Sequence, residues 1–137
     1  MKYPKSPQEK TGGIVYFGRM VEKIRLLAAG ELHPDLHANL GKGFDERCVD
    51  FLGVKYDALR GKVQEGLNDQ QVLEWCFANG TKPTDEQIEV WNGFMSKRGW
   101  NDEVTEILLR RKKESGFEAR DEIQTMFQYI DADEGRL

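Results

Sequence analysis

The sequence has few cysteines and no long apolar run, and each shortage excludes a class of protein. Among 137 residues only Cys48 and Cys76 are cysteines. Secreted domains of this size usually carry several disulfides, so we expect two reduced, buried thiols. No apolar segment approaches the roughly 20 residues that cross a bilayer, and residues 1–10 hold no apolar signal core. These features predict a cytoplasmic protein with no membrane partner.

An excess of basic residues is also missing. The chain has 20 lysines and arginines against 24 aspartates and glutamates, a formal net charge of −4. A mildly acidic domain repels nucleic acid on average, so such a partner would need a local basic patch. The run Arg110-Arg111-Lys112-Lys113 could form one, but it lies at the predicted end of a helix, where cations complement the helix dipole. Nucleic acid is therefore not an expected partner.

Length and composition favour one folded domain. The chain is 39% hydrophobic and 32% charged, which suits a compact domain and argues against disorder. We expect a single α-helical domain over residues 1–137. Residues 1–12 should form an extended N-terminal arm and residues 131–137 a frayed acidic tail.

Sustained two-residue alternation is absent, whereas apolar residues recur at helical spacing between glycines. The only β-like run, residues 13–17, leads directly into a helical pattern. Asn68 with Gln71, and Thr84 with Gln87, have the spacing of capping boxes. The predicted helices span about 13–29, 44–52, 56–66, 69–79, 85–97, a segment capped at 101 or 102 and stopped at Gly116, and 118–130, with one turn begun at Pro34. The predicted class is all-α, a compact irregular (orthogonal) bundle of about six or seven short helices.

Several short motifs occur together along most of the chain. They are Ser6-Pro7, Gly12-Gly13, Arg19-Met20, Lys23-Ile24-Arg25, Gly41 to Asp45, Arg47-Cys48, Phe51-Leu52-Gly53-Val54 with Tyr56, Trp75-Cys76-Phe77, and Trp91 through Phe94-Met95 to Gly99-Trp100. On these motifs the sequence resembles an uncharacterised bacterial family, domain of unknown function 5069. The resemblance implies a bacterial, cytoplasmic, single-domain protein. It implies no reaction or ligand, and no catalytic residue can be carried over.

Two histidines raise the question of a metal site. His33 and His37 are four residues apart, a spacing that zinc sites use on helices. A zinc ion needs at least one more protein ligand, and Pro34 keeps His33 at or before the start of any helix. The alternative is two polar loop residues, so we expect no metal and no other cofactor.

An anion site is the main candidate for small-molecule chemistry. The turn Gly41-Lys42-Gly43 precedes a predicted helix, whose free N–H groups and dipole attract anions. Arginines on neighbouring helices could hold a carboxylate or phosphate in a bidentate manner. The alternative is that the same charges pair with each other and tie the helices together. The candidate ligand-binding residues are Arg19, Lys42, Asp45, Arg47 and Arg98, with Asp45 expected to orient Arg47.

Aromatic residues offer a second kind of site. Trp91 shares a helical face with Ile88 and Met95 and should lie in the core, whereas Trp75 and Trp100 should lie nearer the surface. Exposed aromatic or apolar helix faces often form dimer interfaces or ligand pockets. No catalytic motif stands out. We therefore expect a binding or interaction module that self-associates as a homodimer. The alternative is an anion-binding protein or enzyme that uses Arg19, Asp45 and Arg47.

Overall fold

The glycine-separated apolar patterns fold into seven α-helices and one short 3-10 helix. The structure, a computed structural model, describes residues 1–137. The elements in chain order are β1 (Lys10–Thr11), β2 (Ile14–Val15), α1 (Phe17–Ala28), η1 (Pro34–Asn39), α2 (Phe44–Leu52), α3 (Tyr56–Gln64), α4 (Asp69–Asn79), α5 (Asp85–Lys97), α6 (Thr105–Glu114) and α7 (Met126–Asp133). The predicted all-α class is confirmed, and the β-like run contributes one strand of a small antiparallel hairpin. None of the helices is both long and apolar enough to cross a membrane.

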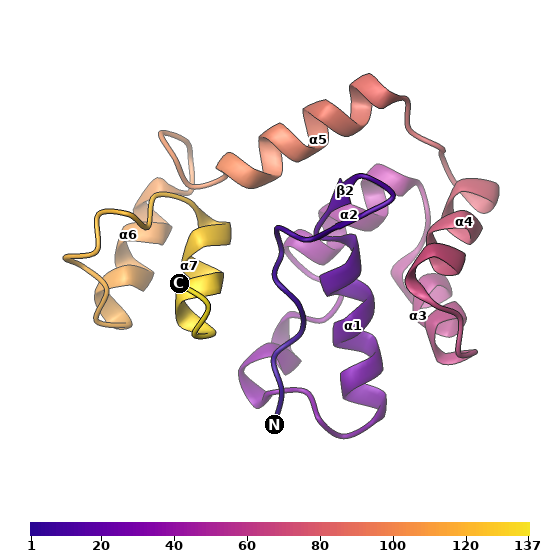
Figure 1. Ribbon diagram of the computed structural model, residues 1–137, viewed down its shortest axis with the longest axis horizontal. Helices are drawn as coiled ribbons and strands as arrows, with labels where there is room; N and C mark the ends of the chain where they lie inside the picture. Colours follow the sequence, from indigo (N-terminus) through magenta and orange to yellow (C-terminus); the bar gives the residue numbers. More distant parts are fainter.

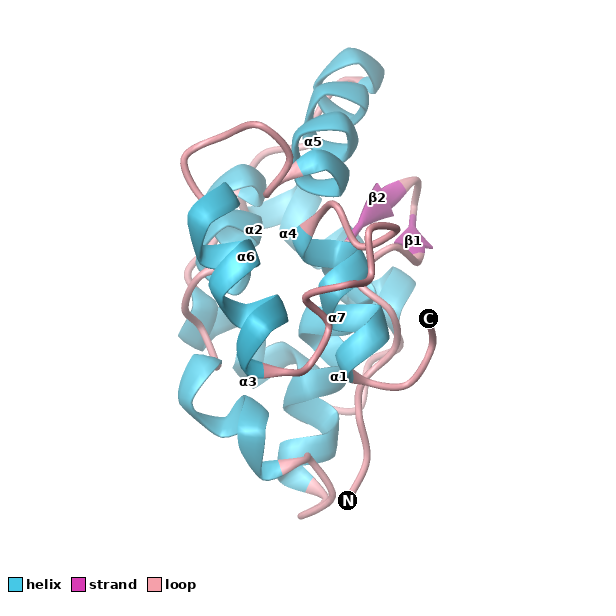
Figure 2. Ribbon diagram, turned by 90° about the vertical axis from the view of Figure 1, so that its left-hand side faces the viewer, coloured by secondary structure: helices cyan, strands magenta, loops and turns pink.

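The helices form two unequal groups that α5 spans. The hairpin and helices α1 to α4 make up the larger group, α6 and α7 the smaller one, and α5 runs across the top of both (Figure 1). Helix α1 packs against α3, and α5 packs against β2 and α7. Turned by 90°, the molecule shows α6 and α7 in front of the larger group (Figure 2).

Two hydrophobic clusters hold these groups together, and Phe127 of α7 packs into the larger one. The main cluster has 18 buried residues and includes Trp91, whose indole N–H donates to the carbonyl of Val15 over 3.2 Å. The smaller cluster has four: Leu108, Ile123, Met126 and Ala132. Cys48 and Cys76 are buried and unpaired. The predictions of a core Trp91 and of two buried free thiols are therefore confirmed.

A close backbone approach places α5 beside α2. A Cβ atom at Gly80 would lie 2.2 Å from the carbonyl oxygen of Leu52, so only glycine fits there. The next amide, that of Thr81, donates to the same oxygen over 2.8 Å. The chain that enters α5 is thus fixed against the end of α2.

The end of the chain differs from the prediction. A helix was expected over residues 118–130, but the helix in this region, α7, begins only at Met126. It begins there because Thr125 and Gln128 form a capping box. Before it, the Lys112 ammonium donates to the carbonyls of Arg120 and Ile123 and holds this segment in turns. The expected frayed tail at 131–137 is also wrong. Residues 131–133 complete α7, and the next residue is bound to α1 as described below.

Candidate functional site

The five predicted ligand residues separate into different places. Asp45 and Arg19 are buried in the interior. Lys42 is exposed on the turn before α2. Arg47 and Arg98 lie together against one aromatic ring at the surface. Of the five residues, the structure therefore brings together only Arg47 and Arg98. Protein groups already surround Arg19 and Asp45.

Asp45 is fully buried and accepts four hydrogen bonds. The Tyr16 hydroxyl donates to its Oδ1 over 2.6 Å, and the Lys23 ammonium reaches both oxygens at 3.1 and 2.9 Å. The amide of Gly41 donates to Oδ2 over 3.0 Å. Asp45 thus binds groups from α1 and the preceding turn, and the expected pair with Arg47 does not form. These contacts fill the hydrogen-bonding capacity of the Asp45 carboxylate without any bound ligand.

Burial shifts the pKa values of Tyr16 and Lys23, the two side chains bound to Asp45. Burial and the neighbouring Asp45 raise the pKa of Tyr16 well above its usual value. Burial lowers the pKa of Lys23, with Asp45 acting against the shift. Tyr16 also has a φ of 75°, which is rare for a residue other than glycine. Its bond to Asp45 helps to hold this strained start of α1.

Arg19 is bound by Glu134, the residue that follows α7. Its guanidinium donates two hydrogen bonds to the Glu134 carboxylate, at 2.8 and 2.6 Å, and both side chains are almost fully buried. It also donates to the carbonyl of Lys5. A protein carboxylate thus takes the bidentate position that a ligand would need.

The two histidines also bind protein groups. A ring nitrogen of His37 contacts the carbonyl of Leu32 over 2.9 Å. The His33 Nδ1 accepts from the amide of Asp35, and its ring stacks on Tyr3. No three histidine, cysteine, aspartate or glutamate side chains gather in a way that could hold a metal ion.

Arg47 and Arg98 converge on Phe94. Their guanidinium carbons lie 5.1 and 5.3 Å from the centre of its ring, within the range of cation–π contact. Arg98 also lies 3.4 Å from Asp102, whereas Arg47 has no acidic partner within 4.0 Å. Arg47 is exposed, so its charge is free to meet a group from outside the chain.

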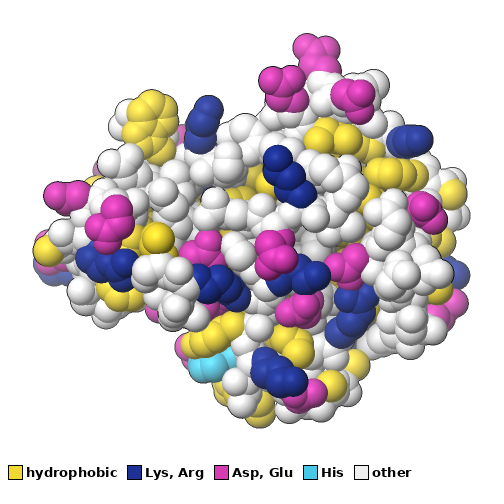
Figure 3. Space-filling view, in the orientation of Figure 1, with side chains coloured by type: hydrophobic (Ala, Val, Ile, Leu, Met, Phe, Trp, Pro, Cys, Tyr) yellow, Lys and Arg dark blue, Asp and Glu magenta, His cyan; other side chains and the backbone are white.

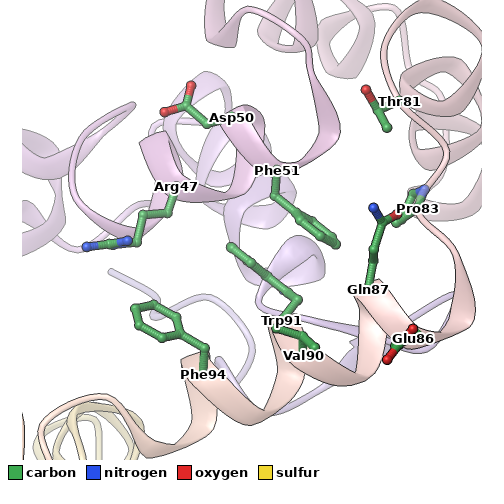
Figure 4. Close-up of a pocket in the computed structure, with 10 residues that line it drawn as sticks. All are labelled: Arg47, Asp50, Phe51, Thr81, Pro83, Glu86, Gln87, Val90, Trp91 and Phe94. Carbon is green, nitrogen blue, oxygen red and sulfur yellow. The ribbon is translucent and has the colours of Figure 1, made fainter.

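Beside Arg47, a groove of about 720 Å³ runs between α2 and α5 (Figure 4). Its floor is Phe51 and Trp91, whose rings stack with centres 4.6 Å apart. On α5, Val90 is 66% exposed and Phe94 41% exposed. The groove is lined by Arg47, Asp50, Phe51, Thr81, Pro83, Glu86, Gln87, Val90, Trp91 and Phe94. Exposed apolar residues around such a floor are typical of binding surfaces.

Charge is distributed unevenly along α5. Its first turns carry Asp85, Glu86 and Glu89, whereas Lys97 and Arg98 stand at its end. Acidic side chains gather over the N-terminal end of this helix at the top of Figure 3. Arg47 and Glu86 lie at opposite ends of the groove (Figure 4). The groove thus has Glu86 at one end, Arg47 with the carboxylate of Asp50 near it at the other, and apolar side chains between.

Most of this groove was missed by reasoning from the sequence. One available signal was a second apolar face on α5. Val90 and Phe94 are four residues apart and fall off the stripe of Ile88, Trp91 and Met95. An apolar pair on the outer face of a helix with a separate core stripe indicates a contact surface.

The comparisons with known proteins place the whole sequence in one family. No curated protein matches the chain. The family described as "Domain of unknown function (DUF5069)" matches residues 1–136. The resemblance read from the short motifs is therefore confirmed, and the chain belongs to the DUF5069 family.

Proposed function

We propose that this protein is an interaction module that binds another protein chain through the groove between α2 and α5. The observation that carries the proposal is the exposed apolar pair Val90 and Phe94 beside the stacked rings of Phe51 and Trp91. Burial of exposed apolar side chains is the main favourable term in protein association. The unpaired charge of Arg47 at the rim of the groove would orient the bound partner and would contribute only a minor part of the affinity for it.

A photo-crosslinking amino acid at position 90 tests this proposal. Val90 points to solvent, so p-benzoylphenylalanine in its place should leave the melting temperature unchanged. Irradiation in extract of the source cells, and of the purified chain, should give adducts whose protein partner and attachment site mass spectrometry identifies. Leu109 on α6 is 56% exposed and outside the groove, so the same label there is the matched control. Equal labelling at both positions, or none at position 90, would overturn the proposal.

Binding of a small aromatic carboxylate is a second candidate function. It is favoured by the unpaired Arg47 guanidinium beside the ring of Phe94. A groove of about 720 Å³ also falls within the size range of small-molecule sites. Unlike the site expected from the sequence, this one would not use Arg19 or Asp45, since protein partners surround both.

Benzoate and inorganic phosphate are suitable probes for this second function. Millimolar benzoate should raise the melting temperature of the native protein, and Arg47→Ala should remove the rise. Phosphate, which lacks the ring, should have a smaller effect. An equal rise in the Arg47→Ala variant would exclude this site as the source.

A further inference from the structure

We infer that the groove's partner is a second copy of this chain, bound so that the two α5 helices run antiparallel about a two-fold axis at Val90. This inference rests on the proposed function, since it names the occupant of the same groove. A two-fold interface brings one surface against itself, so each patch must be complementary to its own rotated image. The face of α5 meets that requirement in the order of its acidic, apolar and basic residues.

The register follows from the spacing of three residues. Glu86, Val90 and Phe94 lie four residues apart and share one exposed face of α5. Val90 is the midpoint, so an antiparallel axis through it places Val90 against its own copy. The same axis places Glu86 opposite Phe94 of the other copy, about 12 Å away along the helix from its own Phe94.

Charge complementarity then favours this register. Phe94 is the ring on which Arg47 and Arg98 lie, at 5.1 and 5.3 Å. Glu86 of one copy is therefore placed near the exposed Arg47 guanidinium of the other, and the symmetry makes this contact twice. Neither Glu86 nor Arg47 has an ion-pair partner within its own chain, so their contact would not have to break one, whereas Arg98 would keep its own partners, Asp102 at 3.4 Å and Glu103 at 3.9 Å. The apolar centre, Val90 and Phe94, becomes buried between two charged ends.

A parallel arrangement of the two helices would have the opposite effect. It would bring the acidic first turns of α5 together and the basic ends together, which is unfavourable at close range. A different protein could still occupy the groove, but it would have to reproduce this pattern of acid, apolar and basic groups. The chain itself already presents that pattern in the required order.

Charge exchange tests the dimer and its register together. In sedimentation equilibrium the native protein should form dimers. Glu86→Arg and Arg47→Glu each turn two attractive contacts into repulsive ones, so each should raise the dissociation constant about tenfold or more. An equimolar mixture of the two variants should recover the affinity, because both contacts become Arg–Glu pairs again. The double variant Glu86→Arg/Arg47→Glu should also recover it.

Two further variants separate this effect from a loss of folding or a general change of charge. Glu106→Arg, at an exposed position of α6 outside the groove, makes the same charge change and should leave the dissociation constant unaltered. Val90→Glu should abolish the dimer while the melting temperature of the monomer stays the same. Circular dichroism checks that every variant is folded.

Different results would show a failure of the proposed dimer and a failure of the proposed function. A native chain that sediments as a monomer at its highest soluble concentration overturns the dimer, as does a mixture that fails to recover affinity. If position 90 then crosslinks to a different, identified protein, the interaction module survives and only the second copy is excluded. A monomer that also gives no adduct at position 90 overturns both.

Discussion

A single carboxylate, Asp45, joins α1 to the turn before α2. It is fully buried and bound to Lys23, Tyr16 and the amide of Gly41. Removing one member of a buried pair leaves an uncompensated charge, which is far more costly than losing both. The contribution of this pair is therefore best measured with single and double variants.

Asp45→Ala should lower the free energy of unfolding by about 3–5 kcal/mol, because the buried Lys23 ammonium loses its counter-ion. Adding Lys23→Met should recover part of that loss. Urea unfolding followed by circular dichroism gives both values. A double variant as unstable as the sum of the two single variants would show that the two groups do not interact.

The buried thiols and Tyr16 predict a loss of stability in alkali. Burial raises the pKa of Cys76 from 9.0 to about 12, and it raises those of Cys48 and Tyr16 well above their usual values. Above pH 9 the unfolded chain loses thiol protons that the folded chain retains. The free energy of unfolding should thus be fully maintained below pH 9 and decline towards pH 12, by about 1.4 kcal/mol per pH unit for each thiol.

Lys23 opposes this decline in part. Burial lowers its pKa, so between that lowered pKa and pH 10.5 the unfolded chain retains a lysine proton that the folded chain has lost, and this group alone would make stability rise with pH there. Urea unfolding at a series of pH values between 8 and 11 measures the net slope. Cys76→Ala should make the decline shallower, and an unchanged slope in that variant would exclude Cys76 as a cause.

The positions and contacts of single residues were only partly predictable from the sequence. Trp91, Cys48 and Cys76 could be placed in the core because each falls at or beside a local helical stripe. Asp45 could not be assigned correctly, since its partner Lys23 lies 22 positions away and only the tertiary path brings the two together. Local spacing contains no information on such a contact.

At the level of helices, α7 shows where local signals compete. The apolar pattern of 118–130 predicted a helix eight residues too early, whereas the Thr125–Gln128 capping box and the bonds of Lys112 decide the actual start. The opposite case is α5, whose bounds were predicted correctly because Thr84 and Gln87 form the expected box. Capping residues here determine helix starts better than apolar spacing does.

Docking of α7 onto α1 should depend on Glu134. Glu134→Gln leaves the buried Arg19 guanidinium without a counter-ion, so the free energy of unfolding should fall by about 3 kcal/mol. Glu114→Gln, on an exposed glutamate of α6, should change it by less than about 0.5 kcal/mol. Thermal and urea unfolding measure both variants. Equal effects would indicate that the pair with Arg19 does not stabilise the fold.

For the molecule as a whole, the two hydrophobic clusters predict unequal local stability. The main cluster has 18 buried residues and the one around α6 and α7 has four. Amides of α6 should therefore exchange with solvent through openings that cost less free energy than those of α1. Native-state hydrogen exchange measures this directly. Exchange of both helices only through global unfolding would show one cooperative unit instead.

The fold class could be predicted from the sequence, but the arrangement of the groove could not. The class follows from helical spacing and glycine stops, which are local. The groove exists because the close approach at Gly80 sets α5 beside α2. That contact joins residues 28 positions apart, Leu52 and Gly80, and no pattern within either helix encodes it.

The pairing of Arg19 with Glu134 also bears on how the chain is synthesised. The two residues are 115 positions apart, so Arg19 leaves the ribosome long before its partner is added. Until then a guanidinium that the finished fold buries has no carboxylate to meet, and α1 cannot complete its packing without that cost. We expect the larger group of helices to collapse first and the end of the chain to lock it last. A nascent chain that stalls before Glu134 would leave the Arg19 guanidinium on α1 without its carboxylate partner.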